Sequence, residues 1–504
     1  MKEAWGFISH ELRSHPVIYL LLFIVFSAGV WFRVAHLDVR LGFYYDQGRD
    51  ALEVQKILHG HLTLIGPTTG IDGLFHGPLY YYFLTPLYFL TGGNPAHVAV
   101  VMGFFNSLAI FAIFAVAALC MNRIAGLVAA FLFAFSFETV TFSRWFSNPS
   151  PQMIFSILGI LALWLLTQKK SWGLPLLAFA IAFGFQFEAV SLITFIPAAL
   201  VVLLWQRKAL AQFLKKRDLV ASLVFALFGI GPYLLFELRH QFLMTRALVR
   251  LLFHESGFGL SLWQVAAQRG SFYLDVYNNL LLRNREQTLL LLIILSTVIV
   301  FLWVRDRLSS AWKVLIVWTL SPLIVLLFYQ GNNGYVWGYY LSPTLPAVIL
   351  LLSGLAGLLW KSAGGKVVVL LFLVIFTRVH QPILAVYTGP LAEYGPETIL
   401  FGNQLRAIDW IYQDAGGEPF NVDVYVPPVV PYAYDYLIPW RGQKQYQTQP
   451  VAETVRLLYT LSEVDSPHPE RLSAWLARQA VIAPRVEKEA SFGGITVARR
   501  RRNT

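Results

Sequence analysis

The sequence is poor in cysteine and in charged residues. Its 504 residues include one cysteine, Cys120, so the chain can form neither an internal disulfide nor a cysteine metal site. Only 13% of the residues are charged, whereas 57% are hydrophobic and 15% are aromatic. Soluble globular domains carry about 25% charged residues. This composition excludes an ordinary soluble protein and predicts a chain that lies largely in lipid.

Three common motifs are also missing from the sequence. It contains no Walker phosphate loop, no Rossmann fingerprint after a strand and no His-Glu-x-x-His zinc helix. These absences argue against a nucleotide-driven pump and a membrane metalloprotease. The formal net charge is +11, but the basic residues gather at the ends of apolar runs. A cluster such as that between Arg207 and Arg217 is typical of a cytoplasmic loop, so we expect no nucleic-acid partner.

Apolar runs recur between residues 17 and 384, and they predict a mainly α-helical, polytopic transmembrane bundle. The first run continues into Trp31-Phe32-Arg33 without a small-residue cleavage site, which indicates an uncleaved helix rather than a signal peptide. About eleven spans of roughly 15–25 residues are expected. They cover residues 17–35, 97–121, 124–142, 152–167, 172–187, 189–205, 219–237, 288–304, 312–329, 340–360 and 366–384.

Basic residues set the expected orientation of these spans. With the N-terminus in the cytoplasm, most short cytoplasmic loops carry Lys or Arg, whereas the short outer turns near 143–151, 186–189 and 330–339 contain only Arg144. An odd number of spans then places the C-terminus outside. We therefore expect a multi-pass protein of the cytoplasmic membrane with residues 36–96 on its outer face.

The character of the chain changes after about residue 385. Helical and strand patterns alternate there, including a period-two strand that begins at Phe420 and a hairpin end at Gly493-Gly494. These patterns predict a small extracytoplasmic α/β domain over residues 385–504, after a transmembrane domain over residues 1–384. The terminal run Arg499 to Arg502 is typical of a frayed, solvated tail near anionic headgroups.

The loop between the first two apolar runs carries the densest group of polar residues. Asp46, Arg49 and Asp50 lie at i, i+3 and i+4, so a helix over residues 46–58 projects all three from one face. A Gly-Pro turn then ends the helix, and His76-Gly77-Pro78 leads into a tyrosine cluster of the kind found at headgroup level.

This order of motifs resembles the GT-C glycosyltransferases over about the first hundred residues. The similar elements are an aromatic-Asp-x-x-Arg start (Tyr45 to Arg49), an amphipathic helix, a Gly-Pro turn and a Pro-Leu-Tyr-Tyr entry into the next helix (Pro78 to Tyr81). Bacterial protein O-mannosyltransferases and lipid A aminoarabinose transferases, of the family 39 type, are the members it resembles most. The resemblance implies transfer of a sugar from a polyprenyl phosphate, by inversion, with a loop aspartate at the reacting centre.

Two residues of the loop have specific predicted roles. Asp46 is the candidate catalytic residue, because a carboxylate can accept the proton of an attacking acceptor hydroxyl. Arg49 is a candidate ligand of the donor phosphate, since its planar guanidinium fits phosphate oxygens. An ion pair of Arg49 with Asp46 or Asp50 is the alternative. A divalent cation between the two aspartates is compatible with their chemistry, but no feature requires it.

Further candidate ligands of the donor phosphate or the substrate lie in the same loop and in later turns. Arg144 is a second candidate for the phosphate, and Asn148 stands in the same turn where related enzymes often carry aspartate. Glu188 is an acid between two apolar runs, which marks either a functional site or an exposed turn. His76 either contacts phosphate or sugar hydroxyls or packs structurally, and Tyr81 completes the set of candidate substrate contacts.

The sequence therefore predicts an integral membrane hexosyl- or pentosyltransferase. Its expected partners are a polyprenyl-phosphate-linked sugar, the bilayer and an acceptor that is a protein, a glycan or a lipid. The alternative is a polytopic transporter or lipid-carrier flippase without transferase activity. A transporter is expected to show charged or broken positions near mid-membrane in paired halves, whereas the polar residues here gather at the outer ends of the spans.

Overall fold

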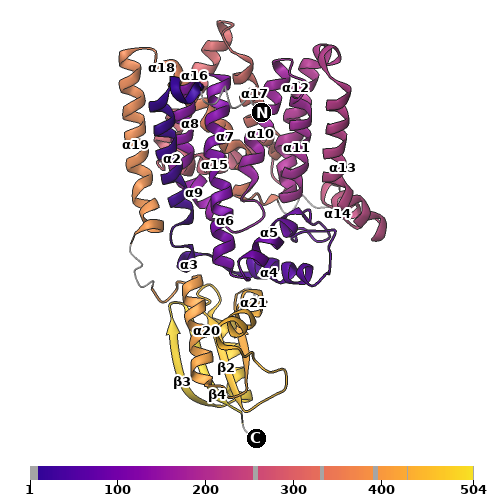
Figure 1. Ribbon diagram of the computed structural model, residues 1–504, viewed down its shortest axis with the longest axis vertical. Coiled ribbons are helices and arrows are strands. Elements are labelled where there is room, and N and C mark those ends of the chain that lie inside the picture. Colours follow the sequence, from indigo (N-terminus) through magenta and orange to yellow (C-terminus); the bar gives the residue numbers. More distant parts are fainter. Residues whose placement is uncertain (1–9, 254–258, 330–333, 390–394, 428–429, 503–504) are drawn as a thin grey trace.

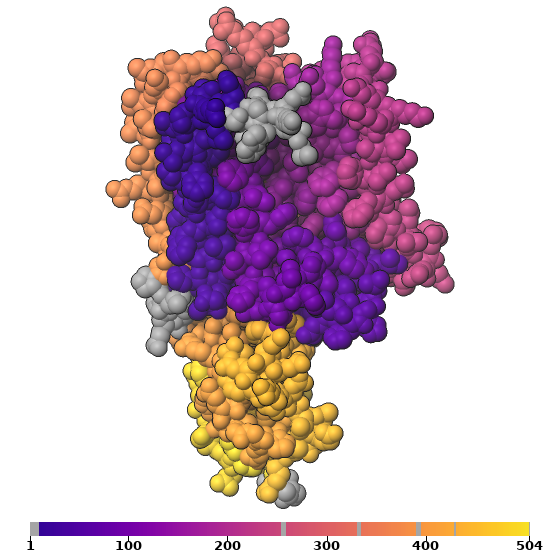
Figure 2. Space-filling model, in the orientation of Figure 1, coloured from indigo at the N-terminus to yellow at the C-terminus, as the bar shows by residue number. Residues whose placement is uncertain are grey.

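The computed structural model describes residues 10–253, 259–329, 334–389, 395–427 and 430–502. A bundle of helices is followed by a small domain built on a four-stranded sheet (Figure 1). In the space-filling view the bundle forms a broad block, and the C-terminal domain is a narrower lobe at one end of it (Figure 2).

The bundle consists of helices that lie side by side along most of its length (Figure 1). They are α2 (Pro16–Val34), α6 (Pro95–Ser107), α7 (Ala109–Cys120), α8 (Arg123–Phe135), α9 (Phe137–Arg144), α10 (Gln152–Thr167), α11 (Gly173–Phe187), η1 (Ala189–Ser191), α12 (Leu192–Phe213), α13 (Lys216–Arg239), α16 (Arg285–Val304), α17 (Ser310–Phe328), η3 (Gly338–Thr344), α18 (Leu345–Leu359) and α19 (Ala363–Thr388).

The predicted membrane bundle is confirmed. Within the described residues eight helical segments are long and apolar enough to cross a membrane, or nine if the pair α8 and α9, bent by 58°, counts as one span. The helices α10 and α11 are apolar but shorter. All eleven predicted spans fall on these segments. The last helix runs to Thr388, four residues beyond the predicted end of its span.

The middle of the bundle is formed by α10, α17 and α18. The side chain of Trp318 on α17 is fully buried, and its ring packs edge-on against Phe195 with the centroids 4.8 Å apart. Its indole Nε1 donates to the backbone oxygen of Pro343 at 2.8 Å, so the one polar atom of this large side chain is satisfied. Most of α18 is buried, whereas α16 is exposed along most of its length and lies at the periphery.

One end of the bundle is covered by shorter helices (Figure 1). They are α3 (Leu37–Arg40), α4 (Tyr45–Leu58) and α5 (Leu79–Leu90) from the first predicted outer loop, together with α14 (Leu243–Phe253). The stretch 238–287, which we expect to be an outer loop, contains α14 and also α15 (Leu262–Leu280), which packs against α16 and α17. The turn between α12 and α13, which carries the basic cluster, lies at the opposite end.

The C-terminal domain continues from the end of the bundle that carries α4 (Figure 1). Its sheet has the order β1-β2-β4-β3, with β1 and β2 parallel and the other two pairs antiparallel. The central strand β2 is buried at every position. The elements are α20 (Phe401–Ala415), β1 (Phe420–Tyr425), α21 (Tyr432–Arg441), the short π-helix η4 (Gly442–Tyr446), β2 (Leu457–Glu463), α22 (Pro469–Ile482), β3 (Arg485–Phe492) and β4 (Ile495–Arg501).

The prediction of a frayed arginine tail is wrong. Arg499 lies within β4 and pairs with Asp414 at 2.7 Å, Glu418 at 3.2 Å and Glu487 at 2.9 Å. Arg501 pairs with the same two glutamates. Because their partners lie on α20, on β3 and in the turn after α20, these arginines join the sheet to its neighbouring elements instead of extending into solvent.

Candidate functional site

Helix α4 carries the candidate catalytic residue and is fixed at its first turn. The backbone N–H of Tyr44 donates to Gln47 Oε1 at 3.0 Å, and this bond satisfies a donor next to the helix start. The other end of the same amide donates to the backbone oxygen of Phe146 at 2.9 Å. Gln47 therefore ties α4 to the turn between α9 and α10. The helix buries Ala51, Val54 and Ile57 on its inner side.

The three charged residues of α4 form one ion-pair group. The guanidinium of Arg49 lies between the two aspartates, 2.9 Å from Asp46 Oδ1 through Nη1 and 2.8 Å from Asp50 Oδ1 through Nη2. Nη1 also donates to Thr68 Oγ1 at 2.8 Å. The predicted alternative, an ion pair of Arg49 with both aspartates, is present in the structure. These ion pairs orient the Arg49 side chain. Its role as a ligand of the donor phosphate stays a prediction.

The two aspartates have different surroundings. The side chain of Asp46 is 52% exposed, whereas that of Asp50 is 3% exposed. Burial raises the pKa of Asp50 to about 6, although Arg49 and the hydroxyl of Tyr81 favour its ionised form. Asp50 Oδ2 is buried without a hydrogen-bond partner among the described residues. Asp46 is therefore the carboxylate that an incoming substrate can reach, and Asp50 is the buried anchor of Arg49.

Tyr81 supports this anchor. Its hydroxyl donates to Asp50 Oδ1 at 3.2 Å from the first turn of α5. Burial raises the pKa of Tyr81 well above its usual range, so the hydroxyl stays protonated and remains a donor. The side chain is buried, so Tyr81 fixes the position of Asp50 rather than facing an open cavity.

Three other candidates meet in a second, buried cluster. His76 Nδ1 lies 3.6 Å from Glu188 Oε1, and Asn148 Nδ2 donates to Glu188 Oε2 at 3.3 Å and to the backbone oxygen of Phe187 at 2.7 Å. Nδ1 of His76 also accepts from the backbone N–H of Ala189 at 3.4 Å. Burial lowers the pKa of His76 to about 3, so the imidazole is neutral at physiological pH.

Asn148 has a specific reason to be an amide in this cluster. Its Nδ2 faces the Glu188 carboxyl and a backbone oxygen, which are both acceptors. An aspartate at this position would bring a second carboxyl against Glu188 and would offer no donor when ionised. The amide therefore fits this neighbourhood, and it supports Glu188 in place of the acid expected from related enzymes.

The structure does not join Arg144 to the group around Asp46. Its Nη1 and Nη2 donate to the backbone oxygens of Phe32 and Ala35 at 2.9 and 3.0 Å, and its guanidinium lies 4.4 Å from the ring centre of Tyr387. These contacts satisfy carbonyls at the end of α2 and connect α2 to α19. Its role as a phosphate ligand stays a prediction.

A large apolar cavity of about 840 Å³ is lined in part by His76 and Glu188 of the second cluster. Its walls come from α11, α12, α13, α14, α17 and the loop 69–76, and its few polar groups include His76, Glu188 and Tyr339. The hydroxyl of Tyr339 lies within electrostatic reach of both Glu188 and Asp46. His76, Glu188 and Tyr339 therefore form a polar part of the lining on the side of the candidate catalytic residue, and Glu237 with Thr245 forms another. An apolar cavity with a few polar groups is typical of a site for an apolar ligand with a polar head.

The sequence analysis missed several residues of this site. Thr68 holds Arg49, Gln47 ties α4 to the turn after α9, and Trp145 in that turn packs against Tyr339 with the ring centres 5.7 Å apart. Their signal was weak because threonine, glutamine and tryptophan are common near membrane interfaces. Only the proximity of Gln47 to Asp46 could have drawn attention to it.

The residues around Asp46 and Asp50 do not form a ready site for a divalent cation. Within the described part of the chain no three His, Cys, Asp or Glu side chains are grouped so that they could hold a metal ion. In addition, the Arg49 guanidinium lies between the two carboxylates and provides their counter-charge. A cation at this position would have to displace that arginine, so the geometry gives no support to a protein-held metal.

Comparison with known proteins extends this description. Residues 75–236, about a third of the chain, match the family model described as dolichyl-phosphate-mannose-protein mannosyltransferase. No curated protein sequence matches the chain. The matched region runs from the loop before α5 to α13, so it contains His76, Tyr81, Asn148 and Glu188.

Two solved structures are similar over nearly the whole length. A crystal structure of ArnT from Cupriavidus metallidurans bound to undecaprenyl phosphate has a TM-score of 0.59 and 11% identity, and covers 96% of this chain and 98% of that one. ArnT from the same organism in the apo state has a TM-score of 0.55 and 12% identity, with 95% and 97% covered. At this identity the likeness establishes the fold. The family match over this third of the chain and the shared fold both support a multi-pass membrane glycosyltransferase, in line with the resemblance to the GT-C enzymes.

Proposed function

We propose that this protein transfers a hexose or pentose from a polyprenyl phosphate to an acceptor hydroxyl at the outer face of the cytoplasmic membrane. The observation that carries the proposal is an accessible carboxylate, Asp46, whose charge reaches Tyr339 in the wall of a large apolar cavity. Such a cavity suits an isoprenoid chain, and its polar groups suit the sugar phosphate. The ArnT structure bound to undecaprenyl phosphate shares this fold.

In the proposed reaction the acceptor oxygen attacks the anomeric carbon of the sugar. The bond between that carbon and the phosphate oxygen breaks, and the electron pair leaves with the polyprenyl phosphate. Asp46 accepts the proton of the acceptor hydroxyl as general base. Attack on the face opposite the leaving phosphate inverts the configuration of the sugar.

The leaving phosphate gains negative charge during this step, and Arg49 is the proposed group that stabilises it. Its guanidinium is already oriented by Asp50 and Thr68, so little reorganisation is needed when the donor binds. We propose that His76, Glu188 and Asn148 contact the sugar or border its site in the cavity. A transporter or flippase has no observation in its favour, because the fold and the family match both belong to glycosyltransferases.

Replacement of Arg49 by lysine tests the phosphate role. Arg49→Lys keeps the charge but loses the planar fork, so the KM for the donor should rise by roughly 10- to 100-fold, the equivalent of one or two charge-assisted hydrogen bonds. The assay measures initial rates at several concentrations of a radiolabelled polyprenyl-phosphate sugar. Arg471→Lys, on the exposed side of α22, is the matched control. An unchanged donor KM in Arg49→Lys would show that Arg49 only forms ion pairs with the aspartates. Arg144→Lys tests the predicted phosphate role of Arg144 in the same assay.

We also propose that the N-terminus is cytoplasmic and that the C-terminal domain, over residues 385–504, is extracytoplasmic. In a variant without Cys120, a membrane-impermeant thiol reagent should label a cysteine at Thr69 or Gln443 in intact cells. It should spare a cysteine at Gln212, in the basic segment near the α12–α13 turn, because positive residues are retained inside. Labelling of Gln212→Cys in sealed cells, with Thr69→Cys protected, would reverse the orientation.

A further inference from the structure

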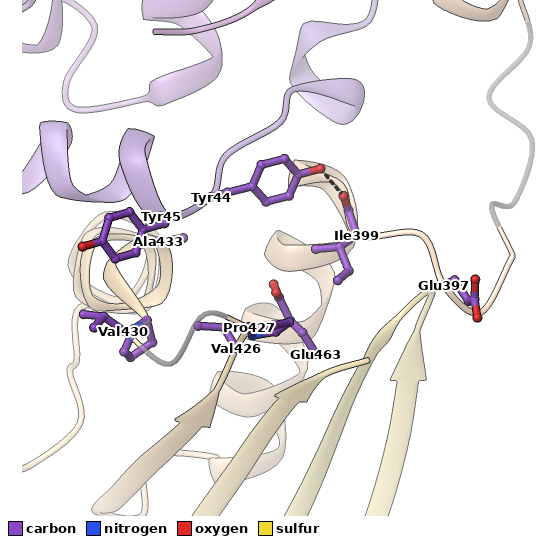
Figure 3. A pocket seen from close by; sticks show the side chains of 10 residues that line it. Tyr44, Tyr45, Glu397, Ile399, Val426, Pro427, Val430, Ala433 and Glu463 are labelled. Atoms are coloured by element: carbon purple, nitrogen blue, oxygen red, sulfur yellow. Dashed lines mark hydrogen bonds between the residues drawn. The ribbon is translucent and has the colours of Figure 1, made fainter. Parts of the chain in front are cut away.

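A second cavity lies between the start of α4 and the C-terminal domain, apart from the apolar cavity described above. It has a volume of about 310 Å³, at the low end of the range for small-molecule sites. Figure 3 shows Tyr44 and Tyr45 on the side of α4, and Glu463, Val426 and Pro427 on the side of the sheet. The cavity is therefore formed jointly by the outer loop of the bundle and the C-terminal domain.

Close packing fixes the two walls of this cavity relative to each other. Helix α21 lies directly on α4, and a Cβ at Gly48 would collide with the backbone of Tyr432 and Ala433. The rings of Tyr45 and Tyr432 lie 4.9 Å apart. The Tyr44 hydroxyl donates to the backbone oxygen of Ile399 at 2.8 Å (Figure 3). Since these contacts set the position of both tyrosines, the cavity is a preorganised feature of the fold.

The ionisable acids of the cavity are the two carboxyls of Glu463 and Glu397, which accept hydrogen bonds when ionised. Glu463 lies at the end of the buried strand β2, and its carboxyl accepts from the Tyr434 hydroxyl at 2.8 Å, which leaves further lone pairs. Burial raises the pKa of Glu463 to about 7. Glu397 lies at the rim of the cavity (Figure 3). Among the described residues that line it there is no Lys or Arg, so the cavity does not suit a phosphate or another anion.

The remaining lining is mostly apolar, with the two tyrosine rings, two prolines, two valines, Ile399 and Ala433. Carboxyl oxygens that accept from hydroxyls, next to ring faces that cover C–H groups, suit a neutral sugar ring better than an extended peptide, which also needs partners for its backbone N–H and C=O groups. The volume admits one or two small rings and not a lipid chain.

The cavity also has the right position for an acceptor. Tyr44 and Tyr45 line this cavity and immediately precede Asp46, so the candidate catalytic residue is next in the chain to the cavity wall. The apolar cavity proposed for the donor is lined by different elements, chiefly α11 to α14. The two cavities therefore offer separate places for the two substrates.

We propose that the cavity between α4 and the C-terminal domain binds the acceptor, and that the acceptor is a neutral, hydroxyl-rich sugar residue. This inference rests on the proposed function and adds to it the class of acceptor. Glu463 and Tyr45 hold the sugar ring, so that one of its hydroxyls reaches the Asp46 carboxylate and the transferred sugar becomes linked to it.

The test uses the full chain in lipid nanodiscs at pH 8, with the radiolabelled donor and a panel of methyl glycosides as acceptor probes. Wild type should transfer label to at least one methyl glycoside. Glu463→Gln, which can still accept from Tyr434, and Tyr45→Ala should raise the KM for that glycoside about 10-fold or more, with the donor KM unchanged. Glu489→Gln, an exposed glutamate of β3, is the matched control and should behave as wild type.

Other outcomes are equally decisive. An unchanged glycoside KM in both folded variants would overturn the acceptor site, and so would transfer by the wild type to a serine- or threonine-containing peptide or to an anionic lipid but to no glycoside. Failure of the proposed function itself is distinct, because the wild type would then release no label from the donor to any acceptor or to water.

Discussion

Asp46→Asn should lower turnover by about 10²- to 10⁴-fold, the usual cost of removing a general base. Asparagine has nearly the same shape as aspartate, but it cannot accept the proton of the attacking hydroxyl. The loss should appear in kcat, with the donor KM little changed, because Arg49 keeps its bonds to Asp50 and Thr68. The measurement is transfer from a radiolabelled polyprenyl-phosphate sugar in membranes that contain equal amounts of each variant.

Asp46→Asn is expected to fold as the wild type does, and two other aspartates serve as controls. Asp46 is half exposed, and an exposed ion pair contributes only about 0–1 kcal/mol to stability. Asp72→Asn changes an exposed aspartate of the same loop and should retain full activity. Asp50→Asn should reduce turnover much less than Asp46→Asn, although it removes the buried partner of Arg49 and should lower thermal stability. Near-normal transfer by Asp46→Asn would refute the catalytic assignment. A loss of activity confined to Asp50→Asn would indicate that Asp50 is the general base.

Local patterns in the sequence were enough to predict most helices and the ion-pair group. Apolar runs specify membrane helices because an isolated backbone in lipid must satisfy its own hydrogen bonds. The spacing of Asp46, Arg49 and Asp50 is local too, since residues three and four apart share a helix face. The missed helix α15 also had a local signal. Ser261 and Gln264 exchange the bonds of a capping box, and this Ser-x-x-Gln spacing was present in the sequence.

Contacts between distant segments could not be predicted in the same way. His76, Asn148 and Glu188 come from three separate loops, and only the packing of the helix ends brings them together. The arginines of β4 were interpreted as a tail because two of their partners lie far away in the chain: Asp414 is 85 positions before Arg499, and Glu418 is 83 positions before Arg501. The cavity between α4 and the C-terminal domain likewise needs the docking of α21 on α4, which no pattern within either helix reveals.

Arg33, near the end of the first apolar run, also depends on contacts with distant segments. A basic residue at the end of a first apolar run is usually expected at the membrane interface. In the structure its side chain is fully buried among helices α2, α8 and α9. It donates to the backbone oxygens of Phe133 at 2.8 Å and Ala134 at 3.1 Å, and to Ser143 Oγ at 3.2 Å. These acceptors lie around the 58° bend between α8 and α9, where the last carbonyls of α8 have no partner within their own helix.

Arg33→Met should therefore be the most destabilising of the single substitutions considered. Methionine fills a similar volume but removes the Arg33 bond to the Ala134 carbonyl, at a cost of about 1–3 kcal/mol for a buried group left without a donor. The Phe133 carbonyl loses Arg33 but keeps the Thr139 hydroxyl as a donor at 2.6 Å. The apparent melting temperature of the purified protein should fall by several degrees, and the folded yield should fall with it. Arg33→Lys should recover part of the lost melting temperature. Arg13→Met, at an exposed position near the N-terminus, should have the same melting temperature as the wild type.

The same variant tests whether the bend supports the site. The turn that follows α9 contributes the Phe146 oxygen that holds Gln47 on α4, and it carries Asn148, which holds Glu188. If Arg33 fixes that turn, the Arg33→Met protein that does fold should also show a raised donor KM, because both clusters depend on the turn. A variant that melts with the wild type would show that water or neighbouring hydroxyls satisfy the two carbonyls. A lower melting temperature with an unchanged donor KM would show that Arg33 stabilises the helix packing but does not affect the donor site.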